Sequence, residues 1–198
     1  MPADIDRISN ALGSSWAGSS DFDLNPGLRQ TPGGALRKAA VLIGLWERPS
    51  GLCLILTKRA SHLLHHPGQI AFPGGKVDEG DFDVASTALR EAREEVGLPE
   101  AMVRVLGLLP QHETVTGFVV TPVVGHIRGE FLPRPEAGEV DEVFLVPFTH
   151  VLDPANYRIE RRLWRGEWRR YYAVPYGPYY IWGATARILR GMAERLAQ

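Results

Sequence analysis

The segment 72–98 crowds carboxylates at a spacing that suits a metal ion. It reads FPGGKVDEGDFDVASTALREAREEVGL, and its REAREE portion contains Glu91, Glu94 and Glu95. On a helix, side chains three or four positions apart have Cβ atoms ~5–6 Å from each other, so these acids repel one another. Hard cations such as Mg²⁺ or Mn²⁺ prefer oxygen ligands, and a bound cation would turn this repulsion into affinity. The alternative is a solvated helix face on which Arg90 and Glu94 form an ordinary i,i+4 pair.

Two glycines next to this segment favour the metal site. Gly74 and Gly75 follow Phe72-Pro73 directly, at a point where the chain enters the acidic segment. Glycine allows a close approach of the backbone that a side chain would block. A loop carbonyl can then join the carboxylates as an oxygen ligand.

An amphipathic helix is expected to present the acids. In the segment 83–96, apolar residues recur at helical spacing and form one buried stripe: Ala85, Ala88, Leu89, Ala92 and Val96. Glu91 and Glu95 flank that stripe. We expect Asp81 to be the N-cap, and Gly97 to end the helix in the left-handed conformation.

Strands and helices alternate along the rest of the chain. Short apolar runs predict strands at 39–46, 52–59, 103–111, 118–127 and 142–148. A second helix is expected at 181–196, with Ile181, Ala184, Ile188, Met192 and Leu196 inward, and a hairpin turning near Arg165-Gly166. This order indicates the α/β (α+β) class, with helices on both faces of a mixed sheet. We expect a short helix and a Gly/Ser/Pro-rich connection at 1–36, and one domain at 37–198.

Composition limits the cellular compartments and the classes of partner that we expect for this protein. The 198 residues suit one domain, and a net charge of -1 gives no case for general affinity for nucleic acid or membranes. The single cysteine, Cys53, lies in an apolar run, which indicates a buried thiol and a reducing compartment. The N-terminus does not resemble a secretory signal, and no apolar run approaches the ~20 residues of a membrane span. We expect a cytoplasmic protein, and a homodimer stays open.

The acidic segment resembles the box of the Nudix hydrolases, G-x5-E-x7-R-E-U-x-E-E-x-G-U, where U is aliphatic. Matching positions are Gly75, Arg90, Glu91, Ala92, Glu94, Glu95, Gly97 and Leu98. The sequence departs from the box at Asp81, which replaces its first glutamate and is followed by eight rather than seven residues before Arg90.

The upstream sequence is similar to a further motif of the coenzyme A pyrophosphatase branch of that family, L-L-T-x-R-S-x3-R-x3-G-x3-F-P-G-G. In LILTKRASHLLHHPGQIAFPGG the residues in register are Thr57, Arg59, Gly68, Phe72, Pro73, Gly74 and Gly75. Ala60 replaces the serine of the motif, and Leu64 replaces its second arginine.

The resemblance implies a Nudix-like α/β/α sandwich that uses Mg²⁺ or Mn²⁺ to hydrolyse the pyrophosphate bond of coenzyme A and its derivatives. The products would be adenosine 3′,5′-bisphosphate and a 4′-phosphopantetheine. The implied metal ligands are Glu91, Glu94, Glu95 and the Gly74 carbonyl, and the implied catalytic residues are Glu91, Glu94 and Arg90, with Arg90 orienting a carboxylate. Candidate substrate-binding residues are Lys58, Arg59, Gly68 and Phe72.

Several alternatives remain open at this stage. The general base is Glu91 in the first interpretation, and Glu113, Glu139 and Glu142 are other candidates, although each is also a plausible solvated loop acid. ADP-ribose, NADH or a nucleoside triphosphate could replace coenzyme A, and a Nudix-like module without turnover is a further alternative. His62, His65 and His66 are interpreted as loop residues of a ligand cleft. The Arg- and Trp-rich hairpin sequence is interpreted as packing rather than as a nucleic-acid surface.

Overall fold

The computed structural model describes residues 2–13, 17–29, 35–164 and 166–197. Its helices are α1 (Pro2–Leu12), α2 (Val84–Val96), α3 (Phe148–Leu152) and α4 (Ala184–Leu196), and short 3-10 turns span Pro26–Leu28, Glu100–Met102 and Pro154–Asn156. Its strands are β1 (Ser19–Ser20), β2 (Arg37–Arg48), β3 (Gly51–Arg59), β4 (Ile70–Ala71), β5 (Gly74–Lys76), β6 (Val103–Leu108), β7 (His112–Glu113), β8 (Phe118–Ile127), β9 (Val140–Pro147), β10 (Arg158–Trp164) and β11 (Glu167–Ala173). The predicted strand at 103–111 is shorter, because the pairing of β6 with β8 ends at Leu108.

A mixed sheet forms the centre of the molecule. Within the described residues it has nine strands, and β2 runs parallel to β8 but antiparallel to β3 and β5. The outer end of β3 lies between β9 and the short strand β4. From β4 the chain crosses to β5, which pairs with β2. The residues of the FPGG sequence therefore pass from the edge of β3 to the edge of β2, where these two neighbouring strands separate.

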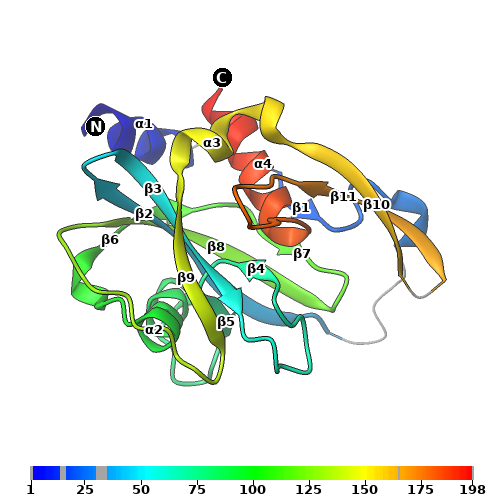
Figure 1. Ribbon diagram of the computed structural model, residues 1–198, viewed down its shortest axis with the longest axis horizontal. Coiled ribbons are helices and arrows are strands. Elements are labelled where there is room, and N and C mark those ends of the chain that lie inside the picture. Colours follow the sequence, from blue (N-terminus) through cyan, green and yellow to red (C-terminus); the bar gives the residue numbers. More distant parts are fainter. Residues whose placement is uncertain (1, 14–16, 30–34, 165, 198) are drawn as a thin grey trace.

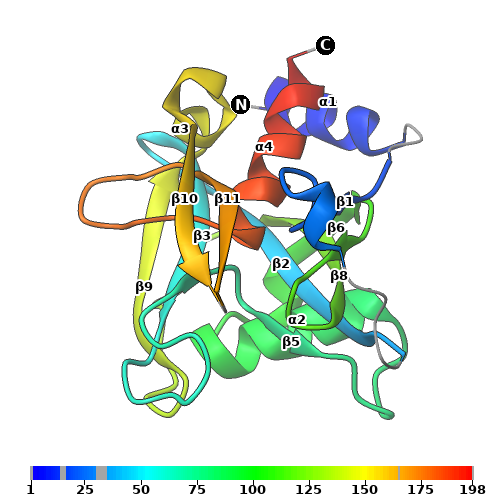
Figure 2. The same cartoon turned by 90° about the vertical axis from the view of Figure 1, so that its right-hand side faces the viewer.

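Helices cover both faces of this sheet (Figures 1 and 2). One face packs on α2 through a core that includes Leu42, Ile55 and Ala92. The opposite face packs on α1, α3 and α4 through a larger core that includes Leu54, Phe144 and Met192. The predicted α/β/α architecture with a mixed sheet between helices is confirmed.

The start of α2 differs from the sequence prediction. Asp83, not Asp81, is the N-cap: its side chain accepts a hydrogen bond from the Ser86 N–H, and the Ser86 hydroxyl accepts one from the Asp83 N–H. This reciprocal pair satisfies backbone donors that a helix end leaves free. Gly97 ends the helix with φ 71°, as predicted.

The start of α4 also lies later than predicted. Gly183 has φ 67° and ψ -138°, so the helix begins at Ala184. Ile181 is fully buried but belongs to the preceding loop, where its carbonyl accepts a hydrogen bond from the Val174 N–H. Of the predicted turn between β10 and β11, Gly166 has φ 81°, while Arg165 lies outside the described residues.

The N-terminal helix packs on the body of the protein. Ile5 and Ile8 of α1 are buried in the core that also contains α4. The division into segments 1–36 and 37–198 stays a prediction. None of the helices in the described part of the chain has the length and apolar character needed to cross a membrane.

Candidate functional site

Two carboxylates of α2 lie against the glycine pair of β5. The Gly74 N–H donates a 3.0 Å hydrogen bond to Glu95 Oε2. A Cβ atom at Gly75 would lie 2.4 Å from Glu91 Oε1, and one at Gly74 would lie 2.5 Å from the Ala40 carbonyl oxygen. Only glycine fits at either position without displacing its neighbours. The FPGG sequence therefore brings the backbone into contact with both acids, as the sequence predicts.

Burial makes these two acids hold their protons more strongly than exposed acids do. Glu95 has only 4% of its surface exposed, and this loss of solvent raises its pKa from an ordinary 4.5 to about 8. The Gly74 N–H opposes the shift, whereas the negative charges of Glu91 and Glu139 add to it. The pKa of Glu91 is also raised, first by burial and then by nearby acids, against the lowering effect of Arg90.

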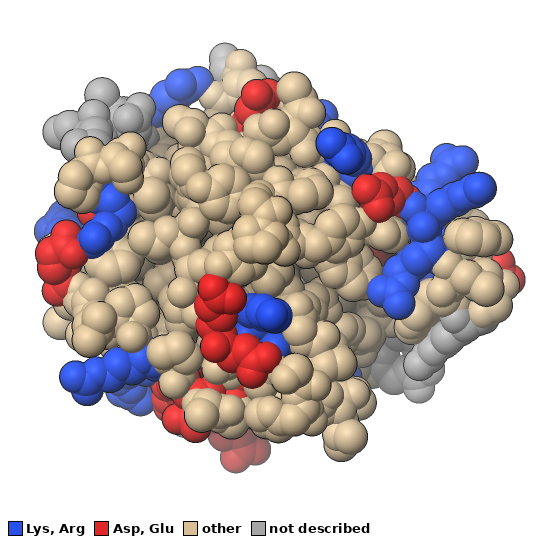
Figure 3. All heavy atoms as spheres, in the orientation of Figure 1, with Lys and Arg blue, Asp and Glu red and all other residues tan. Residues whose placement is uncertain are grey.

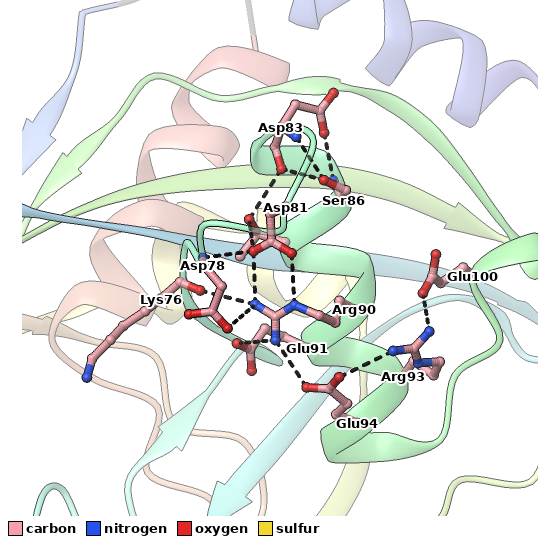
Figure 4. Close-up of polar contacts among 11 residues, drawn as sticks. Lys76, Asp78, Asp81, Asp83, Ser86, Arg90, Glu91, Arg93, Glu94 and Glu100 are labelled. Carbon is pink, nitrogen blue, oxygen red and sulfur yellow. Dashed lines mark hydrogen bonds and ion pairs between the residues drawn. The ribbon is translucent and has the colours of Figure 1, made fainter.

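Arg90 ties together the acids at the edge of this pair (Figure 4). Its guanidinium donates to both oxygens of Asp81, at 2.9 Å and 3.0 Å, and to Glu91 Oε1 at 2.9 Å. It also donates to the Lys76 carbonyl at 3.2 Å. The Arg90 hydrogen bonds hold the pKa of Asp81 well below its usual range. Asp81 thus fixes the guanidinium that in turn positions the Glu91 carboxylate.

Glu94 points away from the buried pair. Its side chain is 50% exposed and forms ion pairs with Arg90 at 3.1 Å and with Arg93 at 3.3 Å. In the described part of the chain no group of three or more His, Cys, Asp or Glu side chains stands at metal-binding positions. The structure brings Glu91 and Glu95 together and leaves the third predicted ligand at the surface.

The candidate bases lie at three different places. Glu139 is exposed, and its charge acts on both Glu91 and Glu95. It lies on a loop that is fixed beside α2 by the bond from the Glu136 N–H to the Glu95 carbonyl. Glu142 accepts a hydrogen bond from the Tyr179 hydroxyl, and Glu113 forms an ion pair with Arg29. Of the three, Glu139 is the one whose charge acts on the buried pair.

The candidate substrate-binding residues also lie at different places. Lys58 and Gly68 line a cavity of about 400 Å³ together with Glu142, Tyr179, Tyr180 and Trp182. Arg59 follows Lys58 in β3, and its positive charge lowers the pKa of Glu95. Phe72 is 4% exposed and belongs to the core. Lys58 therefore lines the cavity, while the charge of Arg59 acts on Glu95.

The loop between β3 and β4 carries the remaining predicted residues. Leu64, which replaces the arginine of the upstream motif, is 94% exposed. His62, His65 and His66 are exposed as well, although neighbouring atoms remove part of the solvent around the His66 ring and lower its pKa.

Sequence reasoning missed two sets of residues. Asp81 was interpreted as a cap, although it is a bidentate partner of Arg90. The aromatic residues Tyr179, Tyr180 and Trp182 were not assigned to a site. Their signal is the sequence PYGPYYIW, in which a Gly-Pro turn presents several aromatic rings in succession.

Comparisons with known proteins identify the family of this chain. The model of the NUDIX domain family matches residues 35–165. Relatives in Escherichia coli O1:K1 / APEC and Shigella boydii serotype 18 are 45% identical over 160 residues, which cover 81% of this chain and 83% of theirs; both are named "Uncharacterized Nudix hydrolase NudL". The crystal structure of the Nudix hydrolase RenU from M. Smegmatis shares the fold, with TM-score 0.51 and 24% identity over 60% of this chain and 74% of that one. The chain belongs to the Nudix hydrolase family, whose members generally use divalent metal ions.

Replacing Gly75 by alanine is expected to weaken cation binding. The new Cβ would lie 2.4 Å from Glu91 Oε1 and would push that carboxylate out of its position. The measurement is the rise in melting temperature on adding Mg²⁺ or Mn²⁺, which reports binding to the folded state. Gly80→Ala is the matched control, because a Cβ there meets nothing within 4 Å. An unchanged rise in Gly75→Ala would show that the position of Glu91 does not matter for the cation.

The metal-free protein is expected to lose stability as the pH rises from about 5 to about 8. In this window the folded protein keeps a proton on Glu95, whose pKa is about 8, while the unfolded chain has lost it near 4.5. The unfolded state then binds fewer protons, so the free energy of unfolding falls with pH. Melting temperatures in the presence of a chelator measure this effect, and Glu95→Gln should flatten the slope. Equal slopes in the two proteins would contradict the shifted pKa.

Proposed function

We propose that this protein hydrolyses the pyrophosphate bond of coenzyme A and its derivatives with the help of Mg²⁺ or Mn²⁺. The observation that carries the proposal is the pair of carboxylates, Glu91 and Glu95, seated on the backbone of Gly74 and Gly75. The products would be adenosine 3′,5′-bisphosphate and a 4′-phosphopantetheine. The single buried thiol of Cys53 suits a reducing, cytoplasmic setting.

The donor set fits a hard divalent cation. Glu91 and Glu95 offer carboxylate oxygens, and the Gly74 carbonyl offers a third oxygen from the same loop. Glu94 would join them only after releasing Arg90 and Arg93. When bound, such a cation neutralises phosphate charge and lowers the pKa of water towards neutrality.

The chain's own residues would position the acids and move the proton. Arg90 holds the Glu91 carboxylate, and Asp81 holds Arg90, so the angle of Glu91 is fixed before substrate arrives. Arg59 supplies positive charge beside Glu95, which suits an anionic diphosphate. A carboxylate with a raised pKa is better suited than an ordinary one to accept a proton near neutral pH. Glu91 is our first candidate for the base, and Glu139 is the alternative.

Other substrates of the same reaction class are the second candidate function. ADP-ribose, NADH or a nucleoside triphosphate would meet the same carboxylate pair, and the replacement of a motif arginine by Leu64 keeps them open. A binding module without turnover is the least favoured, because Arg90 and the glutamates at 91, 94 and 95 of the box are present.

A substrate panel tests the function directly. With Mg²⁺ or Mn²⁺, we expect coenzyme A to give products whose masses match adenosine 3′,5′-bisphosphate and 4′-phosphopantetheine. Glu91→Gln and Glu95→Gln should each lower kcat by orders of magnitude while the circular dichroism spectrum stays unchanged, since only charge is lost. Near wild-type rates in either variant would rule out the carboxylate site. Cleavage of another dinucleotide, with coenzyme A untouched, would move the assignment to that substrate.

A comparison of two glutamates tests whether Glu139 is the base. If the glutamate is a base but not a metal ligand, its replacement by glutamine should lower kcat and leave the cation affinity of the enzyme unchanged. If the glutamate is a ligand, the replacement should lower both. We expect Glu91→Gln to lose both, and Glu139→Gln to keep its cation affinity and most of its kcat. The measurements are kcat at saturating Mg²⁺ and the cation dissociation constant from calorimetry. A loss of kcat by orders of magnitude in Glu139→Gln, with cation affinity unchanged, would make Glu139 the base.

A further inference from the structure

The cavity beside β3 has walls from parts of the chain that are far apart in sequence. Lys58 of β3 and Glu142 of β9 are opposite each other in the antiparallel ladder, and both line the cavity. The facing wall is the loop 176–182, which turns tightly through reciprocal hydrogen bonds between the backbones of Tyr176 and Tyr179. The cavity has a volume of about 400 Å³, which is in the range of small-molecule sites.

The aromatic rings of this cavity are held in fixed orientations. Tyr179 stacks on Phe144, with ring centroids 3.6 Å apart and planes 8° from parallel, and its hydroxyl donates to Glu142 at 2.5 Å. The Tyr180 hydroxyl donates to Glu160 of β10 at 2.6 Å. Because these contacts exist before any ligand arrives, a flat ring could stack here without a large ordering cost.

The cations around the cavity lack acidic partners. Glu142, directly across the ladder from Lys58, is engaged by the Tyr179 hydroxyl. Among the residues that the structure describes, Lys58 and Arg162 form no ion pair. The Arg162 guanidinium lies 5.0 Å from the centre of the Trp182 ring, which lines the cavity. Two uncompensated cations beside fixed aromatic rings favour a ligand that has both a flat ring and negative charge.

The hairpin that carries Arg162 has two different faces. Arg162 and Glu160 lie on the face that contacts the aromatic loop, whereas Arg161 lies on the other face, with its guanidinium 4.9 Å from the centre of the Trp168 ring. Figure 3 shows Lys and Arg side chains gathered on the right-hand side, where Figure 1 has this hairpin. Arg161 and Arg162 therefore share a strand and a type of contact, but only the ring under Arg162 belongs to the cavity.

The cavity and the buried carboxylates lie on opposite faces of the sheet, at the end of β3. Lys58 lines it, and the following residue, Arg59, acts on the charge of Glu95. Ile70, which also lines it, is four residues before Gly74. A ligand with its diphosphate at Glu91 and Glu95 could therefore extend its remaining part around the end of β3 into the cavity.

We propose that this cavity is the specificity subsite for an aromatic base that carries a phosphate group, with Lys58 and Arg162 binding the phosphate and Tyr180 and Trp182 providing the stacking surface. The proposal rests on the proposed function and deepens it, since the adenosine half of coenzyme A has this chemistry. Leu64 replaces the motif arginine and is 94% exposed. Arg162, from a distant hairpin, supplies positive charge in its place.

The test compares the binding of adenosine 3′,5′-bisphosphate with that of AMP, by calorimetry in metal-free buffer at ~0.15 M salt, where the Debye length is ~8 Å. Wild type should bind the bisphosphate roughly tenfold or more tightly than AMP, because one charge-assisted contact contributes about this much affinity. Lys58→Met and Arg162→Gln should each lower this ratio, and the double variant should bring it close to one. Arg161→Gln is the matched control for the loss of one positive charge and should keep the ratio. Tyr180→Leu should lower the affinity for both nucleotides by the same factor.

The outcomes separate this proposal from the proposed function. A wild-type ratio near one, a ratio unaffected by both Lys58→Met and Arg162→Gln, or no binding of either nucleotide would overturn the subsite even if coenzyme A is cleaved. An equal loss in Arg161→Gln would also overturn it, because general charge would then explain the preference. A preserved ratio that depends on Lys58 and Arg162, without any cleavage of coenzyme A, would support the subsite and reject the proposed substrate.

Discussion

The buried carboxyl group of Glu95 is the constraint on which the rest of this site depends. An acid that is 4% exposed loses most of its hydration, and that loss raises its pKa to about 8. The hydrogen bond from the Gly74 N–H offsets part of this cost, and the absence of a side chain at Gly75 leaves room for Glu91 beside it. A well-packed protein has little reason to place two acids together in this way unless a positive charge joins them.

Arg90 explains how the protein tolerates so many acids in one region. Its guanidinium satisfies both oxygens of Asp81 and one oxygen of Glu91, and it pairs with Glu94 on the outside. Glu95 has no hydrogen bond from Arg90 and relies on the Gly74 N–H. The arginine therefore divides the acids into an outer group that it neutralises and an inner pair whose pKa values are raised by burial. In the proposed function, that division leaves the inner pair to bind the cation.

The sequence was informative wherever the deciding interactions were local. The strands, the acidic helix and the close approach at Gly74 and Gly75 all follow from spacing and residue type within one segment. Boundaries were less predictable, because either Asp81 or Asp83 could cap α2, and the reciprocal bond with Ser86 decides between them. Glu94 shared the spacing of the other acids, but its rotamer follows the positions of Arg90 and Arg93.

The cavity could not be predicted because its walls meet only in the folded chain. Lys58 and Glu142 come from different strands, and the aromatic loop follows the hairpin more than 100 residues after Lys58. An arginine missing from a motif suggests a lost contact as long as the motif is considered alone. In the folded protein, Arg162 of a distant hairpin brings another positive charge to Trp182, which is itself part of the cavity wall.

The most direct measurement is the anomalous-difference map of crystals soaked with Mn²⁺, compared between wild type and Glu95→Gln. The account predicts a peak in wild type bounded by the carboxylates of Glu91 and Glu95 and the carbonyl of Gly74, and its loss in the variant. A peak at another group of residues, or a peak that persists in Glu95→Gln, would contradict the claim that the buried pair is the cation site.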